Sequence, residues 1–398
     1  MRLALLTDDW RPTGGVVRHV RLVAPALAAA GHDVLVVHAG DPRDSEAPLP
    51  AGVTVQAIPG ALRDQSAPAN RAAVDRVCLA LAAFRADLAH IHACTNFLVE
   101  DAVRTRVPTI KTVHTLDVCP SGTRFHYATG KVCRHDTGLL CVPRQAYLRC
   151  TLSKRPPVWW RGYRYATTME SRLRTYGHVV VASAFVKQLL VRSGVSADRV
   201  TVIPYFTPAP ASTTAASGRS ILFVGRVTPE KGLDLLLDAL AHVAGPWRLT
   251  VVGDGLALPA IRRRVEHAGW SDRVTLRGWL DGRALTEAYQ QATVVVVPSR
   301  WPEPFGIVGL EAMAQARPVV ACDIGGIPEW LRDGDGGRLV PPGDAASMAS
   351  QIDALLNNPD EAARIAARGH ARVGREFSAA VHLDRLIPLY ERAHAAGG

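Results

Sequence analysis

The chain has 398 residues, of which 48% are apolar and 21% are charged, a balance typical of a globular protein and a length that suits two domains. Its net charge of +10 favours anionic partners, whereas the 6% aromatic content and the lack of a recognisable nucleic-acid-binding motif argue against DNA or RNA. No apolar run is long enough to span a membrane or to form a signal-peptide core, so we expect a cytoplasmic protein whose seven cysteines are mainly thiols or metal ligands.

Short apolar runs alternate with helical periodicity through the first half of the chain. A strand is predicted at residues 3–6, and a helix is predicted after Gly14 and Gly15, where valines recur at helical spacing. Further strands are predicted at residues 34–37, 88–92, 109–113, 179–181 and 200–203. Continuous apolar strands that alternate with helices predict a parallel sheet covered on both faces, so residues 1–206 are expected to form one α/β domain.

A change in composition separates this domain from the next. Residues 207–218 are rich in Pro, Ala, Ser and Thr and are predicted to be a linker. The alternation then restarts, with strands predicted at residues 221–224, 249–252, 274–276, 294–297 and 319–321 and helices at 232–243 and 379–396. We expect a second doubly wound domain at residues 219–376, and a terminal segment, 377–398, that packs back toward the N-terminal domain. We expect the two domains to face a central cleft. Ligands of such sheets bind there, beyond the carboxyl ends of the strands.

The strongest candidate site is a Pro-rich turn between a strand and a helix, in segment 300–314. Glu303 lies in the turn, Gly306 begins the helix, and Glu311 follows just over one helical turn later. Free amides at a helix start bind anions, and a carboxylate can accept two hydroxyl donors at once. The pattern suits a sugar next to a phosphate. The alternative is that Glu303 is an ordinary acid near a helix start and Glu311 a solvated surface residue.

A second turn, at residues 224–232, offers two cations. It leaves a strand at Gly225 and enters a helix near Lys231, with Arg226 and Lys231 on either side of the turn. A guanidinium provides a planar fork and an ammonium a point charge, and both could reach a diphosphate. Two ordinary surface cations are the alternative.

These two segments carry a resemblance to a known family. Gly-Arg-x-x-x-x-Lys-Gly at residues 225–232, the two glutamates at 303 and 311, and the segments 318–321 and 325–329 resemble family 4 of the retaining glycosyltransferases. The resemblance implies the α/β GT-B fold, with two Rossmann-like domains, and transfer of a sugar from a nucleoside diphosphate to an acceptor hydroxyl. Because the fixed cations Arg226 and Lys231 and the helix start after Phe305 would stabilise the leaving diphosphate in place of a divalent ion, no cofactor is expected for catalysis. The alternatives are a nucleotide-sugar epimerase on the same fold or a non-catalytic protein that binds glycans or membranes.

The resemblance also implies a role for each matching residue. Arg226 and Lys231 would bind the donor diphosphate, Glu311 the ribose, and Glu303 the donor sugar. His114, just after a strand, resembles a family histidine that faces that sugar, and its alternative is a structural histidine with satisfied hydrogen bonds. His90, His92 and Asp117 are interpreted as structural. The remaining donor-binding residues implied are Gly14, Gly15, Gly253, Gly278, Trp279, Pro304, Phe305, Gly306 and Ile307.

Four cysteines fall within one segment rich in Gly, Arg and Pro, at positions 119, 133, 141 and 150. Their number suits a tetrahedral zinc site, with His126 and His135 as alternative ligands, but no pair has Cys-x-x-Cys spacing. Free thiols or an occasional disulfide remain as alternatives.

The same region is basic and aromatic. Such a stretch could rest on an anionic membrane or hold an anionic acceptor, and the alternative is a solvated cationic face with its aromatic rings turned inward. The residues concerned are Arg144, Arg149, Lys154, Arg155, Arg161, Arg164, Arg172 and Arg174, with Tyr147, Trp159, Trp160, Tyr163 and Tyr165.

Overall fold

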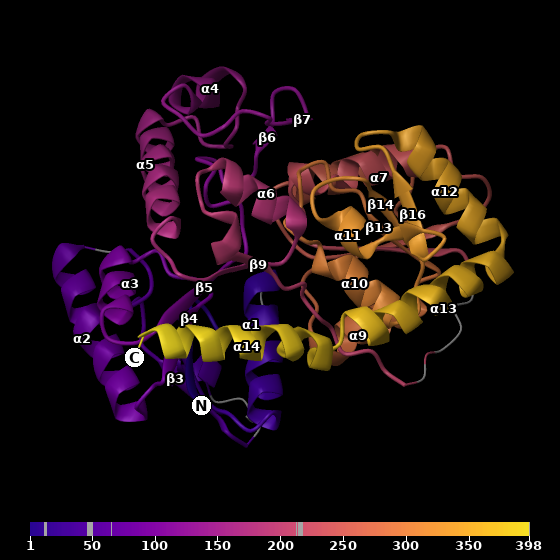
Figure 1. Ribbon diagram of the computed structural model, residues 1–398. Helices are drawn as coiled ribbons and strands as arrows, with labels where there is room; N and C mark the ends of the chain where they lie inside the picture. Colours follow the sequence, from indigo (N-terminus) through magenta and orange to yellow (C-terminus); the bar gives the residue numbers. More distant parts are fainter. Residues whose placement is uncertain (12–13, 46–50, 65, 212, 214–217, 398) are drawn as a thin grey trace.

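The computed structural model describes residues 1–11, 14–45, 51–64, 66–211, 213 and 218–397 and contains two large sheets, one in each half of the chain (Figure 1). The first consists of β1 Arg2–Thr7, β2 Asp33–His38, β3 Val53–Ala57, β4 Leu88–Ile91, β5 Thr109–Val113, β8 Val179–Val181 and β9 Val200–Val202. The second consists of β10 Ser220–Val224, β11 Arg248–Val252, β12 Val274–Leu276, β13 Val294–Val297, β14 Val319–Cys322, β15 Arg332–Asp333 and β16 Gly336–Val340.

Both sheets are parallel and doubly wound. The order is β3-β2-β1-β4-β5-β8-β9 in the first and β12-β11-β10-β13-β14-β16-β15 in the second. Strand order reverses between β1 and β4, and again between β10 and β13. Ligands of such sheets bind beyond the carboxyl ends of the strands at this reversal. The predicted α/β class with two Rossmann-like halves is confirmed.

Helices cover both faces of the first sheet because alternate strand residues point to opposite sides. On one face, Leu3 and Leu5 of β1 pack with α1 (Gly15–Ala29) and α14 (Ala379–Gly397). On the other face, Ala4 and Leu6 pack with α2 (Ala67–Phe84) and α3 (Phe97–Arg104). These two cores lie on opposite sides of the sheet, and a third core of the first half forms around Val179, Val181 and Val200 of β8 and β9.

The second sheet is surrounded by one continuous core. Its helices are α7 Leu233–Leu240, α8 Leu258–His267, α9 Gly282–Gln291, α10 Ile307–Ala314, α11 Ile327–Trp330, α12 Ala345–Asn357 and α13 Pro359–Glu376. Leu235, Leu236 and Leu237 of α7 are all buried, so this short helix packs on more than one side. None of the helices among the described residues is both long and apolar enough to cross a bilayer.

The structure differs from the sequence prediction at several elements, among them the two-residue strand β15, which the sequence analysis does not predict. Strand β3 was not predicted because it is a half-exposed edge with alternating burial, and β16 because it begins with two glycines, which have low strand propensity. The helix predicted at 232–243 is shorter. A 3-10 turn occupies Pro229–Lys231, Gly232 has a positive φ of 73°, and α7 begins only afterwards. Lys231 therefore lies on the turn, before the helix.

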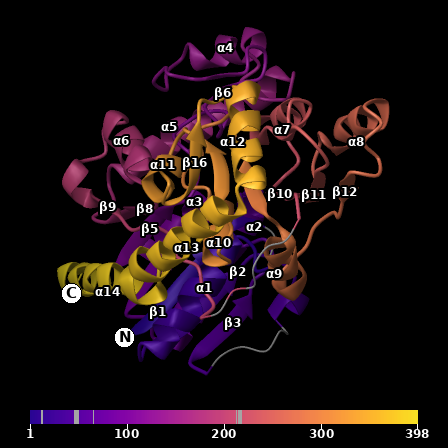
Figure 2. The same cartoon turned by 90° about the vertical axis from the view of Figure 1, so that its right-hand side faces the viewer.

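The chain crosses between its halves twice. At the first crossing, the amide of Thr207 donates to the carbonyl of Phe377, which lies at the second crossing. Helix α14 then runs from α13 along the first half, and its Leu386 and Tyr390 are fully buried there (Figures 1 and 2). Of the predicted linker, the structure describes 207–211, 213 and 218, without helix or strand, and the rest lies outside the described residues.

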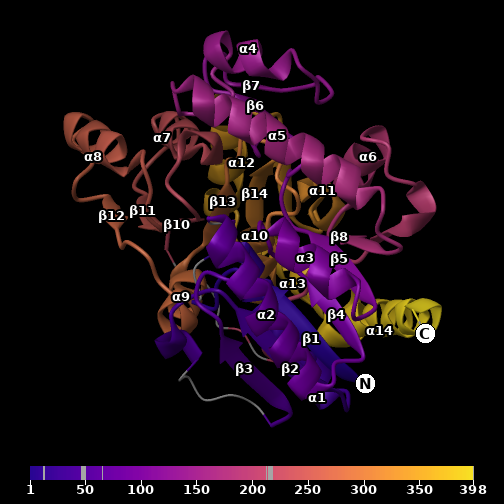
Figure 3. The same ribbon diagram turned by 90° about the vertical axis from the view of Figure 1, so that its left-hand side faces the viewer.

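A separate module extends from one end of the first half. It contains the hairpin of β6 (Phe125–His126) and β7 (Lys131–Val132), followed by α4 (Cys141–Tyr147) and α5 (Pro156–Leu173). In Figure 3, α5 lies across the upper side of the first half, with α4 and the hairpin beyond it. The last helix of the first half is α6, Ala184–Arg192.

Candidate active site

The reversal between β10 and β13 brings the two strongest sequence motifs together. The turn with Arg226 and Lys231 follows β10, and the turn with Glu303 follows the adjacent β13. Nζ of Lys231 lies 2.6 Å from Oε1 of Glu303. Residues 72 positions apart therefore form one site, as the topology of a doubly wound sheet requires.

Glu303 is a buried carboxylate. Its Oε1 also accepts a hydrogen bond of 2.6 Å from Ser299, and only 5% of the residue is exposed. Burial by itself would raise the pKa of Glu303, but the charge and hydrogen bond of Lys231, with the hydroxyl of Ser299, hold that pKa below its usual value. Glu303 is thus ionised near neutral pH, and besides its place near a helix start it has a buried ion pair with Lys231.

Arg226 remains accessible. Its side chain is 60% exposed, and its nearest acid is Glu230, 3.9 Å away. Glu230 is buried and accepts hydrogen bonds from Thr228 and, across the two halves, from the hydroxyl of Tyr127 at 3.0 Å. The guanidinium is therefore at the edge of the site, and its N–H groups are accessible to an anion.

Helix α10 begins beside Glu303 with amides that no side chain caps. Gly306, at the cap position, has a φ of 87°, a conformation that favours glycine and aims the chain into the helix. The preceding turn is fixed from behind, because Trp330 donates to the carbonyl of Phe305 and Ser183 of the first half donates to that of Pro304. Rigid amides at a helix start form a site for an anion.

Glu311 is on the inner side of α10 and is 4% exposed, so it is not a solvated surface residue. Its Oε2 accepts a 2.9 Å hydrogen bond from Tyr289. Its Oε1 forms an ion pair with Arg18 of α1, although without an aligned hydrogen bond. Burial raises the pKa of Glu311, and the charge of Arg18 and the hydrogen bond from Tyr289 offset only part of that effect.

Sequence reasoning did not single out Arg18. It lies four residues after Gly14 on α1, so its position next to the glycine turn was the only available signal. The ion pair with Glu311 joins the two halves directly, and Arg18 holds the carboxylate predicted to bind the ribose. Donor binding at Glu311 would therefore have to displace or share this arginine.

The predicted glycines lie where backbones approach one another. A Cβ added to Gly15 would be 3.9 Å from Ile307, at the start of α10, so the first-half turn does reach the candidate site. Gly14 is directly before α1. In the second half, the amide of Gly253 donates to the carbonyl of Gly278 at 2.7 Å, and Trp279 beside them is 44% exposed.

His114 is part of a buried histidine cluster. Its Nε2 shares a 3.0 Å hydrogen bond with Nδ1 of His92, and its Nδ1 one of 2.5 Å with the hydroxyl of Tyr205. Burial, assisted by the charge of Lys111, lowers the pKa of His114 to about 3, so the ring is neutral. Both nitrogens are engaged, as the structural alternative expects, and a sugar contact would require one bond to be given up.

The four clustered cysteines come near one another in the module, since the pKa of Cys150 responds to the charges of Cys119, Cys133 and Cys141. Burial is the main cause that raises this pKa, to about 12. All seven cysteines are free, and no three His, Cys, Asp or Glu side chains within the described ranges are arranged to hold a metal ion. The zinc site stays a prediction.

The fold and the site together define a glycosyltransferase of the GT-B type. The structure superposes on sucrose-phosphate synthase of Thermosynechococcus elongatus with a TM-score of 0.76 and 25% identity, covering 99% of both chains. Alr3699/HepE of Anabaena in complex with UDP-glucose has the same fold, with a TM-score of 0.75 and 20% identity over 98% of this chain and 100% of that one.

The chain belongs to the glycosyltransferases of family 4 and group 1. The model of Glycosyltransferase Family 4 matches residues 13–207, and that of Glycosyl transferases group 1 matches residues 218–358. A D-inositol 3-phosphate glycosyltransferase of Segniliparus rotundus is 29% identical over 437 aligned positions, covering 100% of this chain and 89% of that protein. The chain spans about half the length of other curated relatives that it matches.

Proposed function

We propose that the protein transfers a sugar from a nucleoside-diphosphate sugar to an acceptor hydroxyl, with retention of the anomeric configuration. The observation that carries the proposal is the ion pair between Lys231 and Glu303 beside the uncapped start of α10. A cation and free amides suit the diphosphate, and buried carboxylates suit sugar hydroxyls. Arg226 adds a second cation at the edge of the site.

In this proposal, the bond between the anomeric carbon and the phosphate oxygen breaks while the acceptor oxygen bonds to the same face of that carbon. The departing phosphate takes the acceptor proton, so no protein base is required. Lys231, Arg226 and the amides of α10 stabilise the growing negative charge on the diphosphate. Glu303 positions the sugar and stabilises positive charge on it without attacking the anomeric carbon.

Stereochemistry and chelation test this proposal. Since fixed cations and amides bind the diphosphate, activity should persist after brief treatment with a chelator, and NMR of the product should show the donor's anomeric configuration. A product of inverted configuration would refute retention. Activity lost on chelation and restored by magnesium or manganese, with the fold intact, would refute the roles given to the cations. An epimerase would convert the donor without any acceptor.

The surface of the module in the first half suits contact with a membrane. Between residue 119 and the end of α5 at residue 173 the sequence has ten Lys or Arg and two acids, Asp136 and Glu170, compared with a net charge of +10 for the whole chain. Large apolar side chains are exposed in the same stretch, with Tyr147 64% and Trp160 49% exposed. Exposed aromatic residues beside clustered cations are typical of a surface that binds anionic lipid. We therefore propose that this module docks on an anionic membrane.

Liposome binding tests the docking surface. The double variant Arg161→Ala/Arg164→Ala should bind anionic vesicles about thirtyfold more weakly, since each cation near such a surface contributes about 1 kcal/mol. Binding should also fall with salt. The matched control is Arg262→Ala/Arg263→Ala, which removes two exposed cations from α8 of the other half and should bind normally. Equal binding to neutral vesicles, or no binding to either kind, would contradict the proposal.

A further inference from the structure

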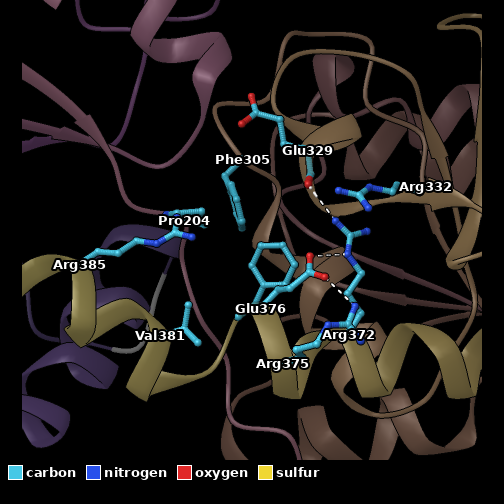
Figure 4. A pocket seen from close by; sticks show the side chains of 10 residues that line it. Pro204, Phe305, Glu329, Arg332, Arg372, Arg375, Glu376, Val381 and Arg385 are labelled. Carbon is cyan, nitrogen blue, oxygen red and sulfur yellow. Dashed lines mark hydrogen bonds and ion pairs between the residues drawn. The ribbon is translucent and has the colours of Figure 1, made fainter. Parts of the chain in front are cut away.

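A cavity of about 350 Å³ lies where the chain crosses between its halves, outside the candidate active site. Arginines dominate its lining, with Arg332, Arg372, Arg375 and Arg385 arranged around Phe305 and Pro204. Figure 4 shows Arg385 reaching in from α14 on one side and Arg332 from the opposite side. Phe305 is shared with the turn of the proposed donor site, but neither that site nor the membrane surface uses the four arginines of this cavity.

The cavity carries excess positive charge. Arg372 and Arg375 both donate to Glu376, and a nitrogen of Arg372 also lies 3.8 Å from a carboxylate oxygen of Asp335. The carboxylate of Glu329 is turned away and accepts from the amides of Ala184 and Phe185 at the start of α6. Arg332 and Arg385, both exposed, have no acidic partner in the part of the chain that the structure describes. Two guanidinium groups are therefore uncommitted.

The two uncommitted arginines belong to different halves of the molecule. Arg385 lies on α14, whose apolar side is part of a core of the first half, whereas Arg332 is in β15 of the second sheet. Both halves also meet at Phe305, whose ring lies 5.1 Å from that of Tyr205 and 6.3 Å from that of Phe377. An anion held by both arginines would connect the halves directly behind the turn that leads into α10.

We propose that this cavity binds a phosphate-bearing small molecule, a phosphomonoester such as a sugar phosphate. The guanidinium fork matches phosphate oxygens, and the volume suits a small organic ligand better than a lone ion. Because the ligand contacts both halves, it stabilises their present arrangement, so it and the sugar donor increase each other's affinity. This coupling rests on the proposed function, whereas the binding itself does not.

Calorimetric titration tests the binding. Inorganic phosphate, a hexose 6-phosphate and the unphosphorylated hexose are the probes, and each titration is repeated with saturating nucleoside diphosphate to occupy the candidate donor site. The hexose phosphate should bind in both conditions, and the free hexose should not. The variants Arg332→Ala and Arg385→Ala should each weaken binding about tenfold, the scale for one charge-assisted hydrogen-bonded partner. If inorganic phosphate binds as tightly as the hexose 6-phosphate, the cavity recognises the phosphate group and makes no use of the sugar.

The control pair Arg262→Ala/Arg263→Ala should leave the affinity unchanged. Hexose phosphate binding that survives the loss of both Arg332 and Arg385, or that nucleoside diphosphate abolishes, would overturn the proposal, because the ligand would then occupy another site. The coupling is measured separately, as an expected fall of about fivefold in the donor KM when hexose phosphate is present. An unchanged KM would refute the coupling, and failure of sugar transfer would leave the binding result intact.

Discussion

Replacing Lys231 with alanine is expected to lower kcat at least about a hundredfold, the usual scale for losing one group that stabilises charge in the transition state. Lys231 lies 2.6 Å from Glu303 and on the turn after β10, where it would meet the leaving diphosphate. Because negative charge on that group grows as the glycosidic bond breaks, turnover should fall more than donor affinity does. Steady-state kinetics with a donor titration separate the two.

Stability must be measured in parallel, because the variant leaves the buried Glu303 without its counter-charge. The double variant Lys231→Ala/Glu303→Gln removes both charges and should recover much of the lost melting temperature without recovering turnover. Near-normal kcat in a folded Lys231→Ala protein would show that this lysine does not bind the leaving group. Full recovery of kcat in the double variant would show that its role is structural.

Acidification from pH 7 to pH 5 is expected to remove most or all of the folding stability. Five histidines are buried together, with exposures between 1% and 7%, namely His19, His90, His92, His114 and His382. Burial lowers the pKa of each, to about 3 for His114 and about 4 for His382. Their mutual repulsion acts in the same direction, since most of these rings face another histidine of the cluster.

The sign follows from linkage. A histidine with a folded pKa below its unfolded value of about 6.5 binds a proton only after unfolding, so stability is present above pH 6.5 and is lost as pH falls. Each contributes at most about 2 kcal/mol between pH 7 and 5, so five contribute at most about 10 kcal/mol, against a typical total of about 5–15 kcal/mol. The raised pKa values of Asp8, Asp117, Glu170 and Glu311 offset part of this loss, because those groups bind protons more readily in the folded state.

Urea unfolding at several pH values measures this effect. His92→Gln should reduce the slope of unfolding free energy against pH by about 1.4 kcal/mol per unit, the value for one proton. His242→Gln, at an exposed position, should not change it. An unfolding free energy that stays constant between pH 6.5 and 5 would show that the cluster already binds protons in the folded protein.

Much of the fold could be predicted because its determinants are local. A run such as residues 294–297, four consecutive valines, is a buried parallel strand from composition alone, and its neighbours follow the same rule. The missed strands are those in which local signals are weak: β3 is a half-exposed edge, β16 starts with Gly336 and Gly337, and β6, β7 and β15 have only two residues each. The residues of the candidate site could also be predicted, because each motif is local: Arg226 and Lys231 lie on one turn, and Glu303 and Glu311 lie in and just after another.

By itself, the sequence determined which segments form strands and helices and which turns carry cations and carboxylates. Only the tertiary structure decided the partners of those groups. The ion pair of Arg18 with Glu311 joins residues nearly three hundred positions apart, and the histidine cluster gathers residues from His19 to His382. The cavity at the crossing likewise forms only because the tertiary structure brings Arg332 and Arg385 to its two sides. Periodicity fixes which side of an element is buried, but the partner across the interface depends on strand order and on where α14 returns, and neither has a local signal.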